Sequence, residues 1–237
     1  MPTPDQMIVS AAQAELRPLG FRRHRRTRVW VADRGWWLHL VALDKSRSGS
    51  TSLVVAAKFL WGPMTEFTYD YGGPLFWREE TGDFATDRPH DGHVWVGGVR
   101  HVDDGRFATD LKQVTGIARQ RVEQMSREIT TPADVARLLS APQSRIGATS
   151  WWHSFHTGAA AGLSGDAELA RGQFARIRPD RMAVAWEHEL KHRAATLSAL
   201  AGDRRALFQR LVADIGATRS RIGLPDTPLA TPPEPVW

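Results

Sequence analysis

Residues 93–125 decide the fold class, and they read HVWVGGVRHVDDGRFATDLKQVTGIARQRVEQM. The stretch up to Val99 is short and rich in valine, with a tryptophan, which is typical of a β-strand. From Phe107 onward the apolar residues recur every three or four positions, as one face of a helix requires. The change near residue 105 therefore separates a region of strands from a region of helices.

The region before this change predicts one helix and an antiparallel β-meander. A helix is predicted over 5–16, with Asp5 as its N-cap. The stretches 21–32, 36–43, 53–60 and 93–99 read as strands, and the turn 32–35 is short and contains a glycine, as in a hairpin. The Gly-, Pro- and aromatic-rich stretch 61–89 is predicted to be a long, partly ordered loop.

The region after the change predicts helices only, over the ranges 107–125, 131–139, 151–163, 167–177, 181–201 and 203–215. Two Gly-Asp pairs, at 165–166 and 202–203, each end one helix with glycine and cap the next with aspartate. This pattern predicts helical hairpins. We therefore expect an α+β fold with an α+β domain at 1–104, a helical region at 105–224 and a Pro-rich tail at 225–237.

Composition limits the chemistry that the chain can carry. It has 237 residues, 42% apolar and 24% charged, with a formal net charge of +5 and no cysteine. Disulfides, thiolate nucleophiles and cysteine metal sites are excluded, and a reducing, cytoplasmic location fits. No apolar stretch is long enough for a membrane span, and the N-terminal residues do not predict a secretory signal. P-loop, dinucleotide-binding and nucleophile-elbow motifs are absent from the sequence.

The first part of the chain resembles the DUF4304 domain family. The resemblance is carried by Leu19-Gly20-Phe21 followed by basic residues, by a strand ending at Val29-Trp30, and by the segment 43–47, which reads LDKSR. The family pattern has QKSR at that last place, so Asp44 departs from it. The resemblance covers about the first 60 residues, and more loosely the first 100. It implies an α+β fold and a small protein of bacterial type, but no established activity and no agreed catalytic residues.

The segment 188–192 reads HELKH, an H-E-x-x-H pattern on a predicted helix. His188 and His192 would lie one turn apart and share Zn²⁺, with Glu189 as general base of a hydrolase. His153 and His156 could join them if their helices pack together. The alternative is a charged, solvated helix face, because Lys191 lies inside the motif and the sequence after it offers no convincing third ligand.

A dense basic run at 22–28 contains five arginines, Arg22, Arg23, Arg25, Arg26 and Arg28. With nearby tryptophans it could bind single-stranded nucleic acid. Successive strand residues point to opposite faces, so the run cannot line one groove. We favour the alternative, an edge strand that its charges protect against aggregation.

Aromatic residues are concentrated in the predicted loop, where a concave apolar surface could bind a ligand. The candidates are Trp61, Phe67, Tyr69, Tyr71, Phe76 and Trp77. We therefore expect a non-catalytic binding protein that needs no cofactor, with an unknown protein or small-molecule partner and no membrane partner. The zinc-dependent hydrolase and the nucleic-acid-binding protein remain the alternatives.

Overall fold

The computed structural model describes residues 1–45, 50–62, 69–78, 83–85, 99–141, 151–178 and 185–235, with backbone alone at 45, 76–78 and 83–85. The chain divides into two compact units that we describe separately. Unit 1 comprises Met1–Asp33, Leu38–Lys58 and Tyr71–Ser126, and unit 2 comprises Arg34–Trp37, Phe59–Asp70 and Arg127–Trp237. Each unit thus combines segments from before and after the change of rhythm at residue 105.

Unit 1 is built on a sheet whose described strands follow the order β1-β2-β3-β4-β5-β6. Their bounds are β1 (Arg22–Arg23), β2 (Val29–Asp33), β3 (Trp37–Lys45), β4 (Thr51–Phe59), β5 (Tyr71–Arg78) and β6 (Asp83–Ala85). The pairings β1–β2, β2–β3, β4–β5 and β5–β6 are antiparallel. Because each strand neighbours the next one in the chain, the predicted meander is confirmed.

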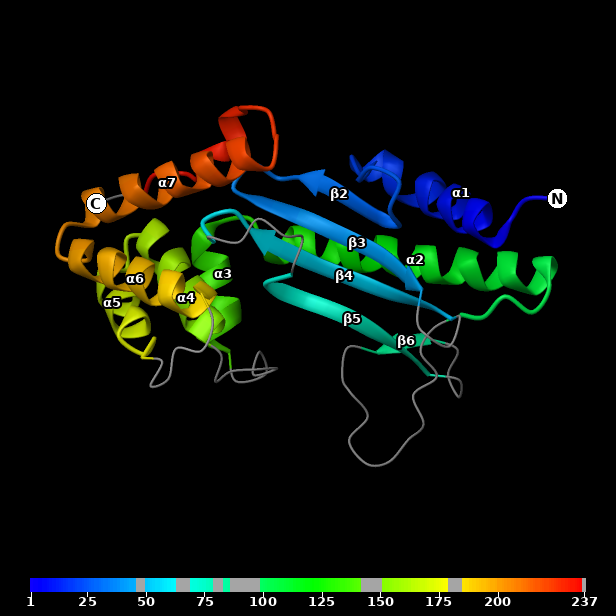
Figure 1. Cartoon of the computed structure of the whole chain (residues 1–237), viewed down its shortest axis with the longest axis horizontal. Coiled ribbons are helices and arrows are strands. Elements are labelled where there is room, and N and C mark those ends of the chain that lie inside the picture. The colour runs from blue at the N-terminus through cyan, green and yellow to red at the C-terminus, as the bar shows by residue number, and fades with distance from the viewer. Residues whose placement is uncertain are drawn as a thin grey trace. The chain divides into compact units, whose positions relative to one another are not determined.

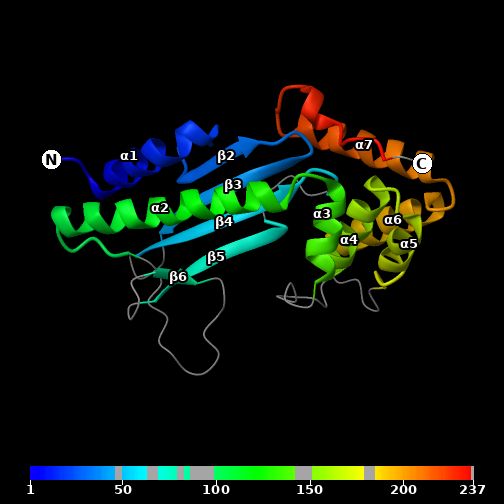
Figure 2. The same cartoon turned by 180° about the vertical axis from the view of Figure 1, so that it is seen from behind.

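Helix α2 (Asp104–Glu128) covers one face of this sheet, and α1 (Pro4–Leu16) lies beside it (Figures 1 and 2). The apolar stripe predicted for α2 is the face that it buries, at Phe107, Leu111, Val114, Ala118, Val122 and Met125. An ion pair joins the two helices, with Arg119 Nη1 3.4 Å from Glu15 Oε2. The strand-to-helix change therefore places α2 directly on the sheet that precedes it.

The start of α1 differs from the prediction. Thr3, not Asp5, is the N-cap, and Pro4 is the first helical residue. The Thr3 hydroxyl accepts a hydrogen bond from Gln6 N at 3.3 Å, and the Gln6 side chain accepts one from Thr3 N at 2.8 Å. This reciprocal pair is a capping box, and proline suits the first helical position because its missing N–H would be unpaired there. Helix η1 (Arg17–Leu19) then ends at Gly20, in the left-handed region.

The prediction of a loop over 61–89 was wrong in part, because β5 and β6 lie inside it. Gly72 pairs with Ala56 of β4, and a Cβ at Gly72 would lie 2.6 Å from the Val55 carbonyl oxygen. The strand needs glycine at this close approach, and glycine and proline in a row read as a loop. Of the strand predicted at 93–99, Val99 forms an antiparallel bridge with Thr51, and 93–98 lie outside the described residues.

Unit 2 is mainly helical, as predicted. Its helices are α3 (Pro132–Ser140), α4 (Trp151–Leu163), α5 (Ala167–Phe174), α6 (Ala185–Leu200), α7 (Arg204–Arg221) and η3 (Pro228–Ala230). Helix α4 contacts α3, α5, α6 and α7 (Figure 1). It is buried along Phe155–Leu163, a stretch of small residues. At Gly158 a Cβ would lie 2.8 Å from the Phe174 ring, so glycine lets α5 pack closely on α4.

The aspartates of the two Gly-Asp pairs cap helices as the sequence predicts, and of the two glycines Gly165 adopts the left-handed conformation. The Asp166 side chain accepts a hydrogen bond from Leu169 N, and the Asp203 side chain accepts one from Ala206 N, both at 3.0 Å. These caps begin α5 and α7 directly after α4 and α6. The predicted α+β class and its helical C-terminal half are therefore confirmed.

Candidate functional site

A series of aromatic rings runs through unit 2, and we call Trp36, Trp61, His156, Trp152 and Trp186 the aromatic series. Trp36 and Trp61 stack with centroids 5.5 Å apart, and Phe59 stacks on Trp61 at 4.8 Å. Trp36 lies in the turn before β3, and Trp61 directly follows β4. Both indoles are buried, and Trp61 is fully so. The strand ends thus supply one half of the series.

Helix α4 contributes His156, whose hydrogen-bond partners settle its tautomer. Trp61 Nε1 lies 3.1 Å from His156 Nδ1. Indole N–H is only a donor, so Nδ1 must accept, and the neutral ring carries its proton on Nε2. Nε2 lies 3.2 Å from Asp70 Oδ1, a distance typical of an ion pair but without hydrogen-bond alignment. The imidazole is therefore hydrogen-bonded at Nδ1 and faces a carboxylate at Nε2.

Asp70 is positioned in turn by the backbone. Its Oδ2 accepts a hydrogen bond from Phe59 N at 2.7 Å. The carboxyl and imidazole groups are almost removed from water, with side-chain exposures of 11% and 3%. A chain of polar contacts therefore runs from Phe59 N through Asp70 and His156 to Trp61, and we call these last three residues the buried relay.

The buried relay has the residue types of a catalytic dyad, but its orientation differs. A general base needs a free lone pair within reach of the substrate proton. The lone pair of His156 Nδ1 already accepts the Trp61 N–H, and Nε2 carries the proton on the side of Asp70. This arrangement orients and fixes a ring; it does not present one for proton transfer.

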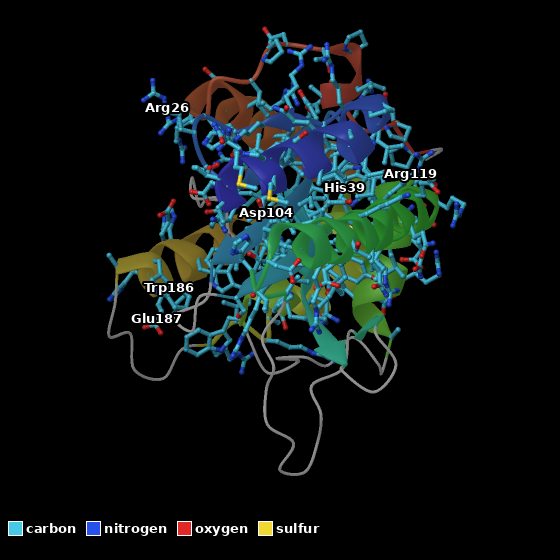
Figure 3. All side chains as sticks on the ribbon, turned by 90° about the vertical axis from the view of Figure 1, so that its right-hand side faces the viewer. Arg26, His39, Asp104, Arg119, Trp186 and Glu187 are labelled. Atoms are coloured by element: carbon cyan, nitrogen blue, oxygen red, sulfur yellow. The ribbon has the colours of Figure 1, made fainter. Side chains whose placement is uncertain are left out.

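The remaining members of the series extend from the buried relay to the surface. The Trp152 indole stacks on the His156 imidazole at 5.8 Å, and the Trp186 indole stacks on Trp152 at 5.7 Å. Trp186 exposes 39% of its surface. Figure 3 shows it beside Glu187 at the start of α6. One face of this ring is thus backed by stacked rings, and the residue remains accessible to solvent.

Buried charges hold α6 and α7 around the series. Arg193 Nη2 donates to the Trp61 carbonyl oxygen at 3.3 Å and lies 3.0 Å from Asp214 Oδ2. Arg210 Nε donates to Asp214 Oδ1 at 3.2 Å. Arg219, which is almost fully buried, donates to the carbonyl oxygens of Gly35 and Pro225. The Arg193 contacts tie α6 to the Trp61 backbone and to α7, the Arg219 contacts tie α7 to two backbone carbonyls, and the Arg210 contact lies within α7.

The four histidines of the predicted zinc site lie in different environments, two exposed on α6 and two on α4 with other partners. His188, Glu189 and His192 are exposed on α6. His153 Nε2 lies 2.6 Å from the Leu139 carbonyl oxygen, and His156 belongs to the buried relay. Within the part of the chain that the structure describes, no three His, Asp or Glu side chains form a group that could hold a metal ion. Zinc binding stays a prediction.

The predicted aromatic surface is only partly described. Trp61 is completely buried in the series, so its ring does not face solvent. Tyr69 is 49% exposed in unit 2, whereas Tyr71 begins β5 of unit 1. Phe67 lies outside the described residues, and only the backbone is described for Phe76 and Trp77. A ligand at these residues stays a prediction.

The predicted basic run forms β1 and the turn that follows it. Arg23 Nε donates to the Thr27 carbonyl oxygen at 2.6 Å, and Arg28 pairs with Asp5. Arg22, Arg25 and Arg26 are exposed, and Arg26 extends outward from the turn (Figure 3). Strand β1 is the first strand in the sheet order, which agrees with the favoured interpretation of a charged edge.

Sequence reasoning missed Asp70, Trp152 and Trp186 as members of a site. Asp70 lies in the stretch predicted to be a loop, and its contact with His156 spans 86 positions (156 − 70). A signal for Trp186 exists, since it lies four residues before the buried Leu190 and so extends the buried stripe of α6. The spacing of residues along α6 does not reveal that Trp186 stacks on Trp152 of α4.

Comparison with known proteins finds no family model, no curated protein and no solved structure that matches this chain. The resemblance to the DUF4304 family therefore stays a prediction. None of the helices that the structure describes is both long and apolar enough to cross a membrane.

Proposed function

We propose that this chain is a non-catalytic binding protein whose binding site is the solvent-accessible side of Trp186. We call this surface the Trp186 face. The observation that carries the proposal is the stacking of a partly exposed tryptophan on Trp152, which in turn stacks on the buried His156. The partner is a protein segment or small molecule with a group that can stack on an indole.

Preorganisation supports this assignment. Binding normally loses side-chain freedom, at a cost of about 0.5–1.5 kcal/mol for each flexible side chain that becomes fixed. Trp186 is already packed on Trp152, so little of that cost remains. Tryptophan is also among the residues that contribute most to binding energy at interfaces. A rigid, accessible indole is therefore the part of unit 2 best suited to contact a partner.

The buried relay supports the non-catalytic part of the proposal. The Nδ1 lone pair of His156 accepts the Trp61 N–H and Nε2 faces Asp70, so in this orientation the ring presents no lone pair to a substrate. Its role in the proposal is mechanical, because it fixes the imidazole on which Trp152 stacks. The same contacts that remove a catalytic candidate thus support a firm binding surface.

Peptide binding tests the proposal. Three fluorescently labelled peptides of equal length, rich in arginine, glutamate or leucine, are titrated with the full chain and followed by anisotropy. We expect saturable binding of at least one peptide, lost in Trp186→Ala. Leu229→Ala is the matched control, since Leu229 is another exposed apolar residue of unit 2. Equal affinities for the wild type and Trp186→Ala would reject the proposal.

Nucleic-acid binding is a second candidate, which the exposure of Arg22, Arg25 and Arg26 favours. Each phosphate contact releases counterions, so affinity for a single-stranded oligonucleotide should fall steeply with salt. The combined change of these three arginines to glutamine should flatten that dependence. A wild-type affinity that salt does not alter would count against this candidate.

A further inference from the structure

We infer that the Trp186 face takes a guanidinium group, the arginine side chain of a partner protein, which stacks on the indole and pairs with Glu189. This inference rests on the proposed function and gives the chemistry of its ligand. It is carried by the spacing of Trp186 and Glu189 on α6, where both are exposed, and by the positive side chains of that helix, which project elsewhere or, for Arg193, are paired.

Trp186 and Glu189 lie three residues apart on α6, and both are exposed. Residues at this spacing are neighbours on a helix surface, with Cβ atoms about 5–6 Å apart. At 100° per residue, Glu189 projects about 60° from the direction of Trp186. A group that lies against the indole is therefore within reach of a carboxylate from the next turn.

The positive side chains of α6 project elsewhere. By the same rotation, His188, Lys191 and His192 lie about 120° or more from Trp186. Arg193 shares the direction of Trp186, but its guanidinium contacts the Trp61 carbonyl oxygen and Asp214. On α6, the side that carries the indole therefore presents negative charge to solvent.

A guanidinium group fits this combination better than the alternatives. It is planar, stacks on aromatic rings, and presents a fork of donors that matches a carboxylate. An ammonium group is a compact, strongly hydrated charge that cannot stack. An acidic ligand would be repelled by Glu189. An apolar ligand would remove water from that carboxylate without offering it a hydrogen bond, which costs free energy. A bound guanidinium would continue the stack of His156, Trp152 and Trp186 by one layer.

Two labelled peptides of equal length and charge, alternating glycine with arginine or glycine with lysine, provide the test. Anisotropy is measured for the full chain at a fixed, physiological salt concentration. We expect the arginine peptide to bind on the order of three- to tenfold more tightly than the lysine peptide, because only guanidinium both stacks and pairs. Equal affinities for the two peptides would overturn the inference.

Variants of α6 separate the two contributions. Glu189→Gln should weaken arginine-peptide binding on the order of threefold or more, and Trp186→Ala should abolish it. Trp186→Phe keeps a ring and should retain part of the affinity, which guards against a loss caused by unfolding. Lys191→Gln is the matched control because Lys191 projects away from the indole, and it should leave the affinity unchanged or slightly higher.

The outcomes distinguish this inference from the proposed function. If Trp186→Ala abolishes binding but Glu189→Gln has no effect, the guanidinium assignment is wrong and the binding site stands. If Trp186→Ala has no effect on any peptide, both fall. Self-association of the wild type that Trp186→Ala removes, measured by sedimentation, would assign the arginine to a second copy and overturn the assignment to a different protein.

Discussion

Two ion pairs of unit 1 and two charged pairs of unit 2 differ in their burial. The ion pairs described in unit 1, such as Arg28–Asp5 and Arg119–Glu15, involve side chains that water reaches. In unit 2, His156 faces Asp70 and Arg193 faces Asp214, and none of these four side chains is more than 15% exposed. The two named pairs of unit 2 are therefore buried, whereas the two named pairs of unit 1 lie at the surface.

This difference in burial indicates which charged pairs contribute most to the stability of the fold. Exposed pairs are screened by water and contribute about 0–1 kcal/mol. Breaking a buried pair costs far more, because the remaining group stays in a medium of low polarity. Substitutions of polar groups should consequently damage unit 2 more than unit 1.

The largest effect is expected for His156→Leu, which removes the acceptor of Trp61 and the ring that faces Asp70. The free energy of unfolding should fall by about 3–5 kcal/mol, as for other buried pairs that lose one member. Urea unfolding followed by circular dichroism measures the change. His188→Leu is the matched control, because His188 is exposed on the same unit and should change stability by about 0.5 kcal/mol or less. Similar losses for the two variants would contradict the importance of the buried relay.

Two tryptophan variants, one in each unit, compare the loss of a buried indole with and without a hydrogen bond. Trp61 Nε1 donates to His156, whereas Trp30 Nε1 in unit 1 is buried without a hydrogen-bond partner among the described residues. Both indoles are almost fully buried. Trp61→Phe should therefore cost about 1–3 kcal/mol more than Trp30→Phe, since only the first change leaves a buried acceptor unpaired. Denaturant midpoints of both variants measure this, and a larger loss for Trp30→Phe would count against it.

The cap of α3 predicts a pH-dependent effect in unit 2. Burial tends to raise the pKa of Asp134, but hydrogen bonds from Thr130, Thr131 and Arg137 outweigh it and hold that pKa well below its usual range. A carboxyl group with a lower pKa in the folded state stabilises the fold above its unfolded pKa, about 3.9, and that contribution is lost as the pH falls through the folded pKa.

Asp134→Ala should thus cost about 1 kcal/mol near neutral pH, and the difference from the wild type should shrink below about pH 4. Thermal unfolding at several pH values measures it. Asp226→Ala, an exposed change in the tail, serves as the control. A difference from the wild type that grows in acid would show that the sign is wrong.

The smallest effect is expected for Arg119→Ala in unit 1. Arg119 pairs with Glu15 and Glu123, but nearly half of its side chain is exposed. We expect a change in melting temperature close to the limit of detection, smaller still at high salt because ions screen exposed pairs. A loss comparable to that of His156→Leu would remove the distinction between the units.

Local sequence alone was enough for most of the elements. The period of Phe107, Leu111, Val114 and Ala118 specified α2, and the caps Asp166 and Asp203 were legible because capping involves residues three positions apart. Strand β5 was missed because Gly72 is required by its close approach to the backbone of β4. That contact is distant in sequence, so the residues next to Gly72 do not reveal it. The candidate site follows the same division: His156 was noticed for its residue type, but not for its partners.

The α+β class, the change from strands to helices and the caps at Asp166 and Asp203 follow from the sequence, since they depend on contacts within a few residues. Which side chains meet depends on the tertiary fold. Trp61 and His156 lie 95 positions apart, and their hydrogen bond decides that the imidazole is a support and not a base. Periodicity records which face of a helix is buried but not what is buried against it, so the chemistry of the site depends on the packing.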